Sequence, residues 1–428
     1  MCNLTIFDSI VYLQEKYVVQ SDTWWWFLFF LRIIGGIMKR VFLVVLDSFG
    51  VGATADAPFY GDVGANTIKS VFDTGVLDIP NLRKMGLFNI DGVSKALRSA
   101  EEYYPLASFA KMAEYSKGKD TTSGHWEICG LPLTETFPTY PEGFPPSIIE
   151  KFQLSTGRKV LCNKPYSGTE VIKDYGIEHI KTGSLIVYTS ADSVFQIAAH
   201  EDIVPVERLY EYCKKARGIL TGKDMVLRVI ARPFVGEYPN FSRTPKRKDF
   251  SVPPPSRTAL DLIKENNLDV LAIGKINDIF VGKGITKSFK TRNNEEGMNV
   301  LLECLDKDFE GLCFLNLVDF DMLYGHRNDA KGYALALNFF DQKLGEVLKK
   351  LKNEDILIIT ADHGCDPGDI STDHTREYVP MIFFGNKIKR GVNLGTLKTF
   401  SDVSATILEY LNINNSLYGT SFFKEVSL

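Results

Sequence analysis

Six short apolar runs in this chain end directly in polar or glycine-rich residues. Runs this short and this apolar are typical of strands that are buried on both faces of a parallel or mixed sheet. Apolar residues at helical spacing over 329–352 precede the last run. This alternation of strands and helices predicts an α/β fold with helices on both faces of the sheet. The six runs are Val41–Leu46, Leu185–Tyr188, Val229–Ala231, Val270–Ile273, Leu312–Val318 and Ile356–Thr360.

The polar residues that follow these runs are candidates for a functional site. Open α/β sheets place their sites at the carboxyl ends of the strands. A single aspartate after a strand is more often a turn residue or a helix cap than a catalytic group. Six endings that carry acidic, basic or histidine side chains favour a site instead. The residues concerned are Asp47, Asp192, Arg232, Lys275, Asp321, Asp362 and His363.

The length of 428 residues exceeds what one compact core usually holds, so two or three domains are expected. The stretch 136–252 is richer in tyrosine, proline and short segments, and the proline run at its end suits a linker. We interpret 136–252 as an insertion or cap domain between two halves of one core, 38–135 and 253–428.

Residues 1–37 do not match this pattern. The apolar run Trp24–Ile34 is broken by Arg32 and is shorter than the ~20 residues that a membrane-spanning helix needs. Acidic residues before this run argue against a signal peptide. We expect the working protein to begin at Met38, with 1–37 as an N-terminal extension outside the fold and with no membrane partner. The alternative is a weak membrane-surface anchor.

The composition argues against several classes of partner and site. With 49 basic and 53 acidic residues the net charge is −4, whereas chains built around nucleic acid usually carry a basic excess, so no nucleic-acid partner is expected. The seven cysteines are scattered, odd in number and never paired as C-x-x-C, which predicts reduced thiols in a cytoplasmic protein. The oligomeric state does not follow from the sequence.

Three histidines late in the chain each have an aspartate close by in the sequence. Mixed aspartate and histidine ligands without cysteine suit Zn²⁺, Mn²⁺ or iron. One such pair alone would most simply be a surface salt bridge, but three in succession favour a metal centre. Asp47 would add an acidic ligand from the other half of the core. The pairs are Asp321 with His326, Asp362 with His363, and Asp373 with His374.

Two neighbouring metal ions suit phosphoryl transfer, because they neutralise the phosphoryl oxygens and activate a nucleophile. Arg232 and Lys275 would bind a substrate phosphate, or would otherwise be rim residues with solvated head groups. A hydroxyl nucleophile would come from the polar segment 118–127, which could instead serve only as a helix cap. Within this segment the candidates are Thr121, Thr122 and Ser123.

Seven stretches of the chain resemble the phosphopentomutase family, which belongs to the alkaline phosphatase superfamily. The resemblance covers essentially all of 38–428, in order and without large gaps. The Asp-His segments are shared across the superfamily, whereas KDTTSGHWE and YTSADS are far more specific to this family. Residues 1–37 have no family counterpart, and Asn328 stands where a second arginine is more usual. The stretches are 38–52, 118–130, 186–201, 228–236, 316–327, 359–367 and 372–380.

This resemblance implies a three-layer α/β/α alkaline-phosphatase-like core with an inserted α/β cap domain. It also implies two Mn²⁺ ions per subunit and a threonine that carries the phosphoryl group. The matching positions are Asp321, His326 and His374 for one metal, Asp47, Asp362 and His363 for the other, Thr121 for the phosphorylated nucleophile that touches the second metal, and Asp192, Arg232 and Lys275 near the sugar phosphate.

The activity that the resemblance implies is the interconversion of ribose 1-phosphate and ribose 5-phosphate, and of the 2-deoxyribose pair. These pentose phosphates would react through a phospho-threonine enzyme and a pentose 1,5-bisphosphate intermediate, with a sugar bisphosphate as activator. The alternatives on the same core are a two-metal phosphohydrolase, another phosphosugar mutase such as a phosphoglycerate mutase, and a metal-dependent binding module without activity.

Overall fold

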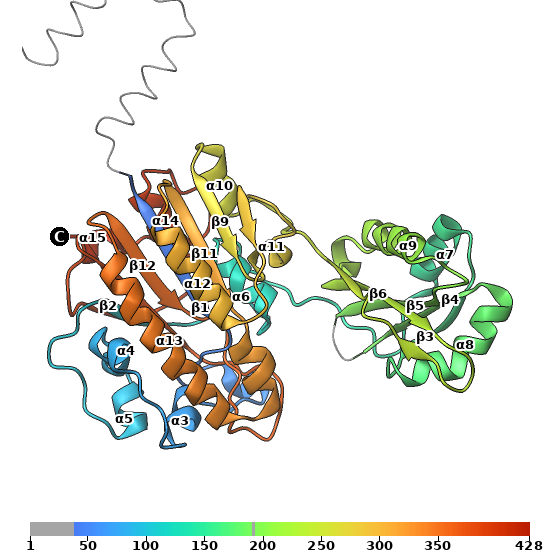
Figure 1. Ribbon diagram of the computed structural model, residues 1–428, viewed down its shortest axis with the longest axis horizontal. Coiled ribbons are helices and arrows are strands. Elements are labelled where there is room, and N and C mark those ends of the chain that lie inside the picture. Colours follow the sequence, from blue (N-terminus) through green and yellow to red (C-terminus); the bar gives the residue numbers. More distant parts are fainter. Residues whose placement is uncertain (1–37, 191–192) are drawn as a thin grey trace, which may run out of the picture. The chain divides into compact units, whose positions relative to one another are not determined.

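The computed structural model describes residues 38–190 and 193–428, so the predicted extension over 1–37 lies outside the described residues. An eight-stranded sheet has the order β10-β9-β11-β1-β12-β13-β2-β14 (Figure 1). Strands β10 to β12 in this order are parallel, β13 is antiparallel to both neighbours, and β14 is parallel to β2. The strands are β1 (Arg40–Leu46), β2 (Ser108–Met112), β9 (Asp269–Ile273), β10 (Lys287–Phe289), β11 (Gly311–Leu317), β12 (Asp355–Thr360), β13 (Val379–Gly385) and β14 (Asn393–Leu397).

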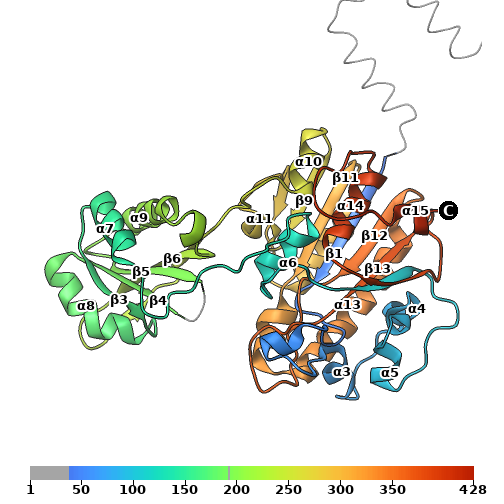
Figure 2. The same cartoon turned by 180° about the vertical axis from the view of Figure 1, so that it is seen from behind.

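Helices cover both faces of this sheet, which gives the predicted three-layer α/β/α core (Figures 1 and 2). One group contains α12 and α13 with α3 and α4, and the other contains α6, α10 and α14. None of the helices within 38–190 and 193–428 is long and apolar enough to cross a membrane. The helices of this core are α3 (Thr67–Phe72), α4 (Pro80–Lys84), α5 (Val93–Leu97), α6 (Thr121–Ile128), α10 (Ala259–Glu265), α11 (Ile276–Ile279), α12 (Asn294–Leu305), α13 (Ala330–Lys350), α14 (Ser401–Tyr410) and α15 (Phe423–Val426).

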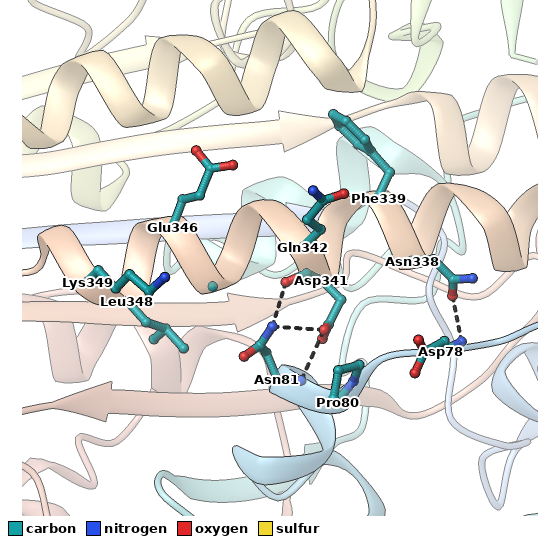
Figure 3. Close-up of a pocket in the computed structure, with 11 residues that line it drawn as sticks. Asp78, Pro80, Asn81, Asn338, Phe339, Asp341, Gln342, Glu346, Leu348 and Lys349 are labelled. Carbon is teal, nitrogen blue, oxygen red and sulfur yellow. Dashed lines mark hydrogen bonds between the residues drawn. The ribbon is translucent and has the colours of Figure 1, made fainter.

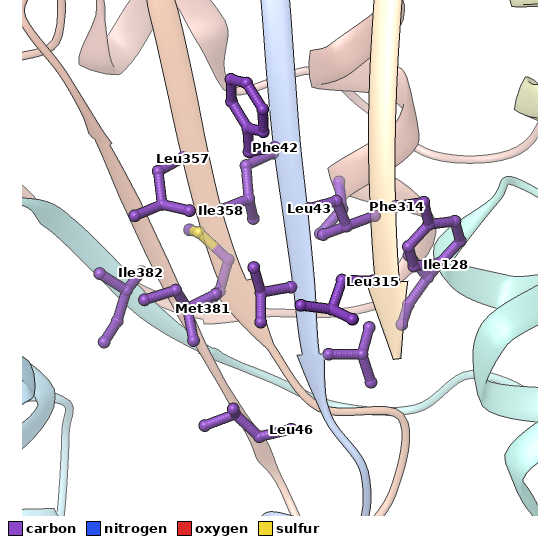
Figure 4. Packing of buried hydrophobic residues seen from close by; sticks show 14 of the residues in the cluster. Phe42, Leu43, Leu46, Ile128, Phe314, Leu315, Leu357, Ile358, Met381 and Ile382 are labelled. Atoms are coloured by element: carbon purple, nitrogen blue, oxygen red, sulfur yellow. The ribbon is translucent and has the colours of Figure 1, made fainter. Parts of the chain in front are cut away.

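Strand β1 lies at the centre of the hydrophobic core, and all seven of its residues are buried. It pairs in parallel with β11 on one side and β12 on the other, so that Leu43 lies opposite both Phe314 and Ile358 (Figure 4). A strand with neighbours on both sides and helices on both faces has no polar face, which explains why every residue of β1 after Arg40 is apolar. The same parallel pairing brings the carboxyl ends of β11, β1 and β12 to one edge of the sheet.

A second, six-stranded sheet has the order β3-β4-β5-β6-β7, with β8 paired to β6. A separate hydrophobic cluster lies on each face of this sheet, because alternate residues of β4 point to opposite faces. Leu185 and Val187 pack with α7 and α9, whereas Ile186 and Tyr188 pack with α8. The elements are β3 (Val160–Pro165), β4 (Leu185–Thr189), β5 (Val194–His200), β6 (Arg228–Val235), β7 (Ser242–Arg243), β8 (Lys248–Ser251), α7 (Pro146–Thr156), α8 (Glu170–Thr182) and α9 (Val206–Ile219).

All six predicted strands form, as does the predicted helix over 329–352, which is α13. Two of the six strands, β4 and β6, belong to the second sheet. Its strands all lie between residues 160 and 251, inside the stretch 136–252. The assignment of that stretch as a cap domain stays a prediction.

The expectation that Arg232 follows the end of its strand was wrong. Strand β6 continues to Val235, so that Arg232 lies inside it. The apolar run stops at Arg232 and Pro233, and proline is a poor indicator of a strand. Pairing with β5 nevertheless continues through Phe234, which lies opposite His200. The end of this strand is therefore set by pairing with its neighbour and not by its own sequence.

Helix α13 also anchors the segment that leads into α4, beside a groove of about 1000 Å³ (Figure 3). The carboxylate of Asp341 accepts hydrogen bonds from the backbone N–H groups of Asn81 and Leu82, at 3.0 and 2.7 Å. Asp341 thus satisfies free N–H groups in the first turn of α4. Burial raises the pKa of Asp341. The groove contains none of the described residues that the sequence indicates as a site.

The central position of β1 leads to a stability prediction. Phe42→Ala should lower the free energy of unfolding by about 3–5 kcal/mol, because the ring is fully buried and its loss leaves a cavity. Leu335→Ala on α13 is the control, since this side chain is 53% exposed. Urea denaturation of both variants measures the difference, and equal losses would contradict the assigned core.

Candidate metal centre and active site

Three neighbouring strands deliver acidic side chains to one edge of the large sheet. Asp47 follows β1, Asp362 follows β12, and Asp321 lies shortly after β11. Asp321 is part of a single turn of π-helix over Phe320–Tyr324, an irregularity that is frequent at functional sites. All three carboxylates are buried, and their relative exposure is 0% for Asp47, 0% for Asp362 and 6% for Asp321. Three buried acidic groups at one sheet edge require compensation by positive charge.

His363 joins Asp47 and Asp362 in a first cluster. Its Nε2 lies 3.5 Å from Asp47 Oδ1 and 3.3 Å from Asp362 Oδ2. Its Nδ1 is 3.0 Å from the carbonyl oxygen of Gly364, to which it donates when the proton is on Nδ1. This hydrogen bond leaves the lone pair of Nε2 directed at the carboxylates, as in histidines that bind metals.

Asp321 lies between two histidines in a second cluster. Its Oδ2 is 3.3 Å from His326 Nε2, and its Oδ1 is 3.3 Å from His374 Nε2. His326 Nδ1 contacts the carbonyl oxygen of Thr372 at 2.6 Å, which orients the ring toward Asp321. The ring centroids of His363 and His374 are 4.0 Å apart, so the two clusters are adjacent.

The chemistry of these atoms fits divalent cations. Four buried atoms of these clusters have no hydrogen-bond partner among the described residues: Asp47 Oδ1, Asp321 Oδ1, Asp362 Oδ2 and His374 Nε2. Burial raises the pKa of Asp47, and the nearby charges of Asp362 and Asp321 raise it further. The hydrogen bond with Asp321 raises the pKa of His326 to about 11. Because a metal binds the deprotonated form of its ligands, metal binding at this site should depend on pH.

The ligand atoms fall into three groups in which all members lie within 4.8 Å of one another. One group is the first cluster, and the other two each contain Asp321 with one of its histidines. Cys365, which the sequence patterns did not indicate, completes the group around His326 and lies 3.9 Å from its Nδ1. The groups are Asp47, Asp362 and His363; Asp321, His363 and His374; and Asp321, His326 and Cys365.

Thr121 is the hydroxyl residue that contacts this centre. Its Oγ1 lies 3.2 Å from His363 Nε2, and it is the first residue of α6. Helix α6 can approach so closely because residue 124 is glycine. A Cβ there would lie 2.1 Å from the carbonyl oxygen of Asp362.

The other two candidate hydroxyl residues are tied to the helix cap. The carboxylate of Asp120 accepts hydrogen bonds from the N–H groups of Thr122 and Ser123, at 3.0 and 3.1 Å. The hydroxyl of Ser123 also donates to Asp120. Asp120 thus caps this helix, as one interpretation of the segment predicted, while Thr121 is the candidate hydroxyl residue beside the first cluster. Its role as nucleophile stays a prediction.

His125 and Asn316 lie behind the first cluster and were not indicated by the sequence patterns. Asn316 Nδ2 donates to Asp47 Oδ2 at 2.8 Å and contacts His125 Nε2 at 3.2 Å. His125 Nδ1 lies 2.9 Å from the carbonyl oxygen of Thr121 and 3.1 Å from Asp362 Oδ2. These contacts orient both carboxylates and tie them to the first turn of α6.

The candidate phosphate-binding residues lie in different sheets. Lys275 follows β9 in the large sheet and precedes α11. Arg232 lies in β6 of the second sheet, where it lines a cleft of about 600 Å³ together with Arg243 and Arg247. Asp192 lies outside the described residues.

Two further arginines of this cleft, Arg243 and Arg247, were not indicated by the sequence patterns. Arg247 forms a two-point ion pair with Asp249, at 2.8 Å for each contact. The buried hydroxyl of Tyr188 has no hydrogen-bond partner within 38–190 and 193–428. Burial raises the pKa of Tyr188, and the charges of the three arginines oppose this shift. Three guanidinium groups around one cleft suit an anion.

Comparison with known proteins decides the family. The sequence profile of the Metalloenzyme superfamily matches residues 39–415. A phosphopentomutase from Lachnoclostridium phytofermentans is 58% identical over 388 residues, covering 91% of this chain and 99% of that protein. One from Acetivibrio thermocellus is 55% identical over 390 residues, covering 91% and 100%. This chain belongs to the phosphopentomutase family.

Membership in the phosphopentomutase family makes the chain an enzyme of the mutase class within the Metalloenzyme superfamily. A sugar phosphate substrate is consistent with this family. Among solved structures, the PH0037 protein from Pyrococcus horikoshii is 13% identical, covers 90% of this chain and 99% of that chain, and has a TM-score of 0.46. That likeness is too weak to carry an argument.

The metal centre leads to a binding prediction. Adding Mn²⁺ to metal-free protein should stabilise the fold, by about 2.7 kcal/mol when the free metal is 100 times its Kd. Asp321→Asn should remove most of this gain, because Asp321 faces both His326 and His374. The exposed residue Asp306 supplies the control, Asp306→Asn. Melting temperatures with and without metal measure the effect, and an equal gain in all three proteins would contradict the assigned centre.

Proposed function

We propose that this chain interconverts ribose 1-phosphate and ribose 5-phosphate, and the corresponding 2-deoxyribose phosphates. Phosphorylated Thr121 would donate its phosphoryl group to the free hydroxyl of the sugar phosphate, which forms a pentose 1,5-bisphosphate. The other phosphoryl group would then return to Thr121. The observation that carries this proposal is the position of Thr121 Oγ1, 3.2 Å from His363 beside the buried carboxylates.

We propose two Mn²⁺ ions per subunit at this centre. The adjacent clusters and their oxygen and imidazole donors support two divalent ions. When bound, such ions neutralise phosphoryl oxygens and favour the deprotonated form of a hydroxyl. Asp321, His326 and His374 would hold one ion, and Asp47, Asp362 and His363 would hold the other, with Thr121 next to the second.

The position of Thr121 at the start of α6 suits a residue that carries phosphate. Anions are favoured at the amino end of a helix, where N–H groups point outward and the helix dipole is positive. His125 contacts the carbonyl oxygen of Thr121 and the carboxylate of Asp362. These contacts would keep Thr121 aligned with the carboxylates that bind the second ion. Alignment of this kind is a large part of catalysis in phosphoryl transfer.

The phosphate that is not being transferred needs a separate binding site. We assign Arg232, together with Arg243 and Arg247, to that phosphate, and Lys275 to charge on the transferred group. Asp192 would lie near the sugar. The stretch 136–252 would act as a cap that excludes water, because water at phospho-Thr121 would turn the mutase into a phosphatase. A sugar bisphosphate would activate the enzyme by phosphorylating Thr121.

The nucleophile assignment is tested with Thr121→Ala. This variant should lose mutase turnover by at least about 10³-fold, since the covalent route is removed, while it still binds metal. Thr122→Ala is the matched control and should stay within a few-fold of wild type. The assay supplies ribose 5-phosphate, Mn²⁺ and a trace of sugar bisphosphate, and follows ribose 1-phosphate and free phosphate together.

The products of that assay also separate the rival functions. Ribose 1-phosphate with little free phosphate supports the mutase. Free phosphate alone would identify a phosphohydrolase on the same centre and would overturn the pentose assignment. Mutase turnover by Thr121→Ala at the wild-type rate would exclude the phospho-threonine route.

The role of the arginine cleft is tested separately. Arg232→Ala should raise KM for ribose 5-phosphate by about 10- to 100-fold, the loss expected for a charged hydrogen bond of about 1.5–3 kcal/mol. Arg208→Ala, at an exposed position on α9, is the control. Steady-state kinetics at fixed Mn²⁺ measure both, and an unchanged KM in Arg232→Ala would remove the cleft from the substrate site.

A further inference from the structure

Arg376 is a buried arginine two residues after His374, and its side chain is only 3% exposed. Its guanidinium contacts two carboxylates, with Nη1 at 2.7 Å from Glu114 Oε2 and Nη2 at 3.0 Å from Asp56 Oδ2. Nε also donates to Asp56 Oδ2 at 3.1 Å. The charge of Arg376 is therefore compensated on two sides within the protein.

The same guanidinium binds the backbone of three alternate residues in one loop. It donates to the carbonyl oxygens of Glu114 at 2.7 Å, Ser116 at 2.8 Å and Gly118 at 2.9 Å. Gly118 is followed within three residues by Thr121. A lysine ammonium has only three donors on a flexible stem, so it cannot bind these three carbonyls together with the carboxylates of Glu114 and Asp56.

The backbone of Arg376 is held as firmly as its side chain. Its N–H donates to Asp62 Oδ2 at 2.8 Å, and its carbonyl oxygen accepts from the Thr54 N–H at 3.1 Å. Asp62 also pairs with Lys119, two residues before Thr121, at 3.1 Å. Lys119 in turn pairs with Asp373, next to His374, at 3.4 Å. The loop that carries His374 and the loop that carries Thr121 are thus joined at two points.

We propose that Arg376 is a positioning residue, which sets the distance between Thr121 and the metal-ligand loop around His374. This inference rests on the proposed role of Thr121 as the nucleophile. Among the described residues, the hydrogen bonds of the guanidinium go to Asp56 and to the loop 114–118, and none goes to a predicted metal ligand, so it would act through that loop. A displacement of about 1 Å between reacting groups can cost about 10²-fold in rate, which makes such a tether important for turnover.

A purely structural role would be the alternative, and Arg40 supplies the matched control. Arg40 is 1% exposed and forms a two-point ion pair with Asp355, at 2.8 and 2.6 Å. It also donates to the carbonyl oxygens of Leu305 and Lys307, at 3.0 and 2.7 Å. It stands at the first residue of β1, whereas Asp47 follows the last. Arg40 and Arg376 therefore share their chemistry but lie at opposite ends of the sheet.

The experiment compares Arg376→Lys, Arg40→Lys and wild type as full-length, Mn²⁺-loaded enzymes. We expect kcat of Arg376→Lys to fall by about 10²-fold, with KM and bound metal within about threefold of wild type. The single-turnover rate of Thr121 phosphorylation by a pentose 1,5-bisphosphate, followed by intact mass, should fall equally. Arg40→Lys should lower the melting temperature but keep kcat.

Two results would overturn the positioning role. One is a wild-type kcat in Arg376→Lys, and the other is an equal loss of kcat in Arg40→Lys.

If Arg376→Lys does not fold, the variant Asp56→Asn tests the same role. Asp56 is 42% exposed, and removing its charge only loosens one side of the guanidinium. We expect a smaller, roughly five- to tenfold loss of kcat at unchanged KM. A wild-type kcat in this variant would reject the proposal.

Measuring Thr121→Ala in the same series separates the nucleophile assignment of Thr121 from the positioning role of Arg376. If Thr121→Ala turns over like wild type, the nucleophile assignment fails. If Thr121→Ala is inactive while Arg376→Lys matches wild type, only the positioning role fails.

Discussion

The structure depends on the meeting of three buried carboxylates, Asp47, Asp321 and Asp362, at one edge of the large sheet. Each follows a strand that is apolar because it is covered on both faces, and each carboxylate is buried. Three of their oxygens have no hydrogen-bond partner within the described part of the chain. Buried carboxylates of this kind require compensating positive charge, which divalent metal ions would supply. The metalloenzyme family of the chain agrees with this requirement.

Contacts elsewhere in the core fix the distances between Thr121 and the groups of this centre. Gly124 lets α6 reach the backbone of Asp362, which brings the Thr121 hydroxyl to the first cluster. His125 ties that helix to the same carboxylate, and Arg376 ties the preceding loop to the segment of His374. These contacts come from segments far apart in the sequence. Phosphoryl transfer depends mainly on fixed geometry and electrostatics, so on the proposed function these contacts would contribute to the rate by holding Thr121 in place.

Much of the fold was predictable because it depends on local patterns. The apolar runs became strands, and the helical spacing over 329–352 became α13. The sequence did not predict the features that depend on pairing between segments far apart in the chain. Arg232 lies inside β6 because β5 holds the strand in register beyond Pro233. Arg243 and Arg247 line the same cleft as Arg232 because the chain turns back along the second sheet. Their spacing in the sequence does not indicate this.

By itself, the sequence determined the class of fold, the family and the set of aspartate and histidine side chains available for a metal, since these follow from hydrophobic periodicity and from motifs of a few residues. The tertiary structure decided which hydroxyl of Thr121, Thr122 and Ser123 meets the centre, because one faces His363 while the segment of the other two is engaged by Asp120. It also brought His125 and Asn316 against the buried carboxylates, and Arg376 against the loop that precedes Thr121. The physical reason is that hydrogen bonds and ion pairs act over about 3 Å, and only folding brings residues hundreds of positions apart within that range.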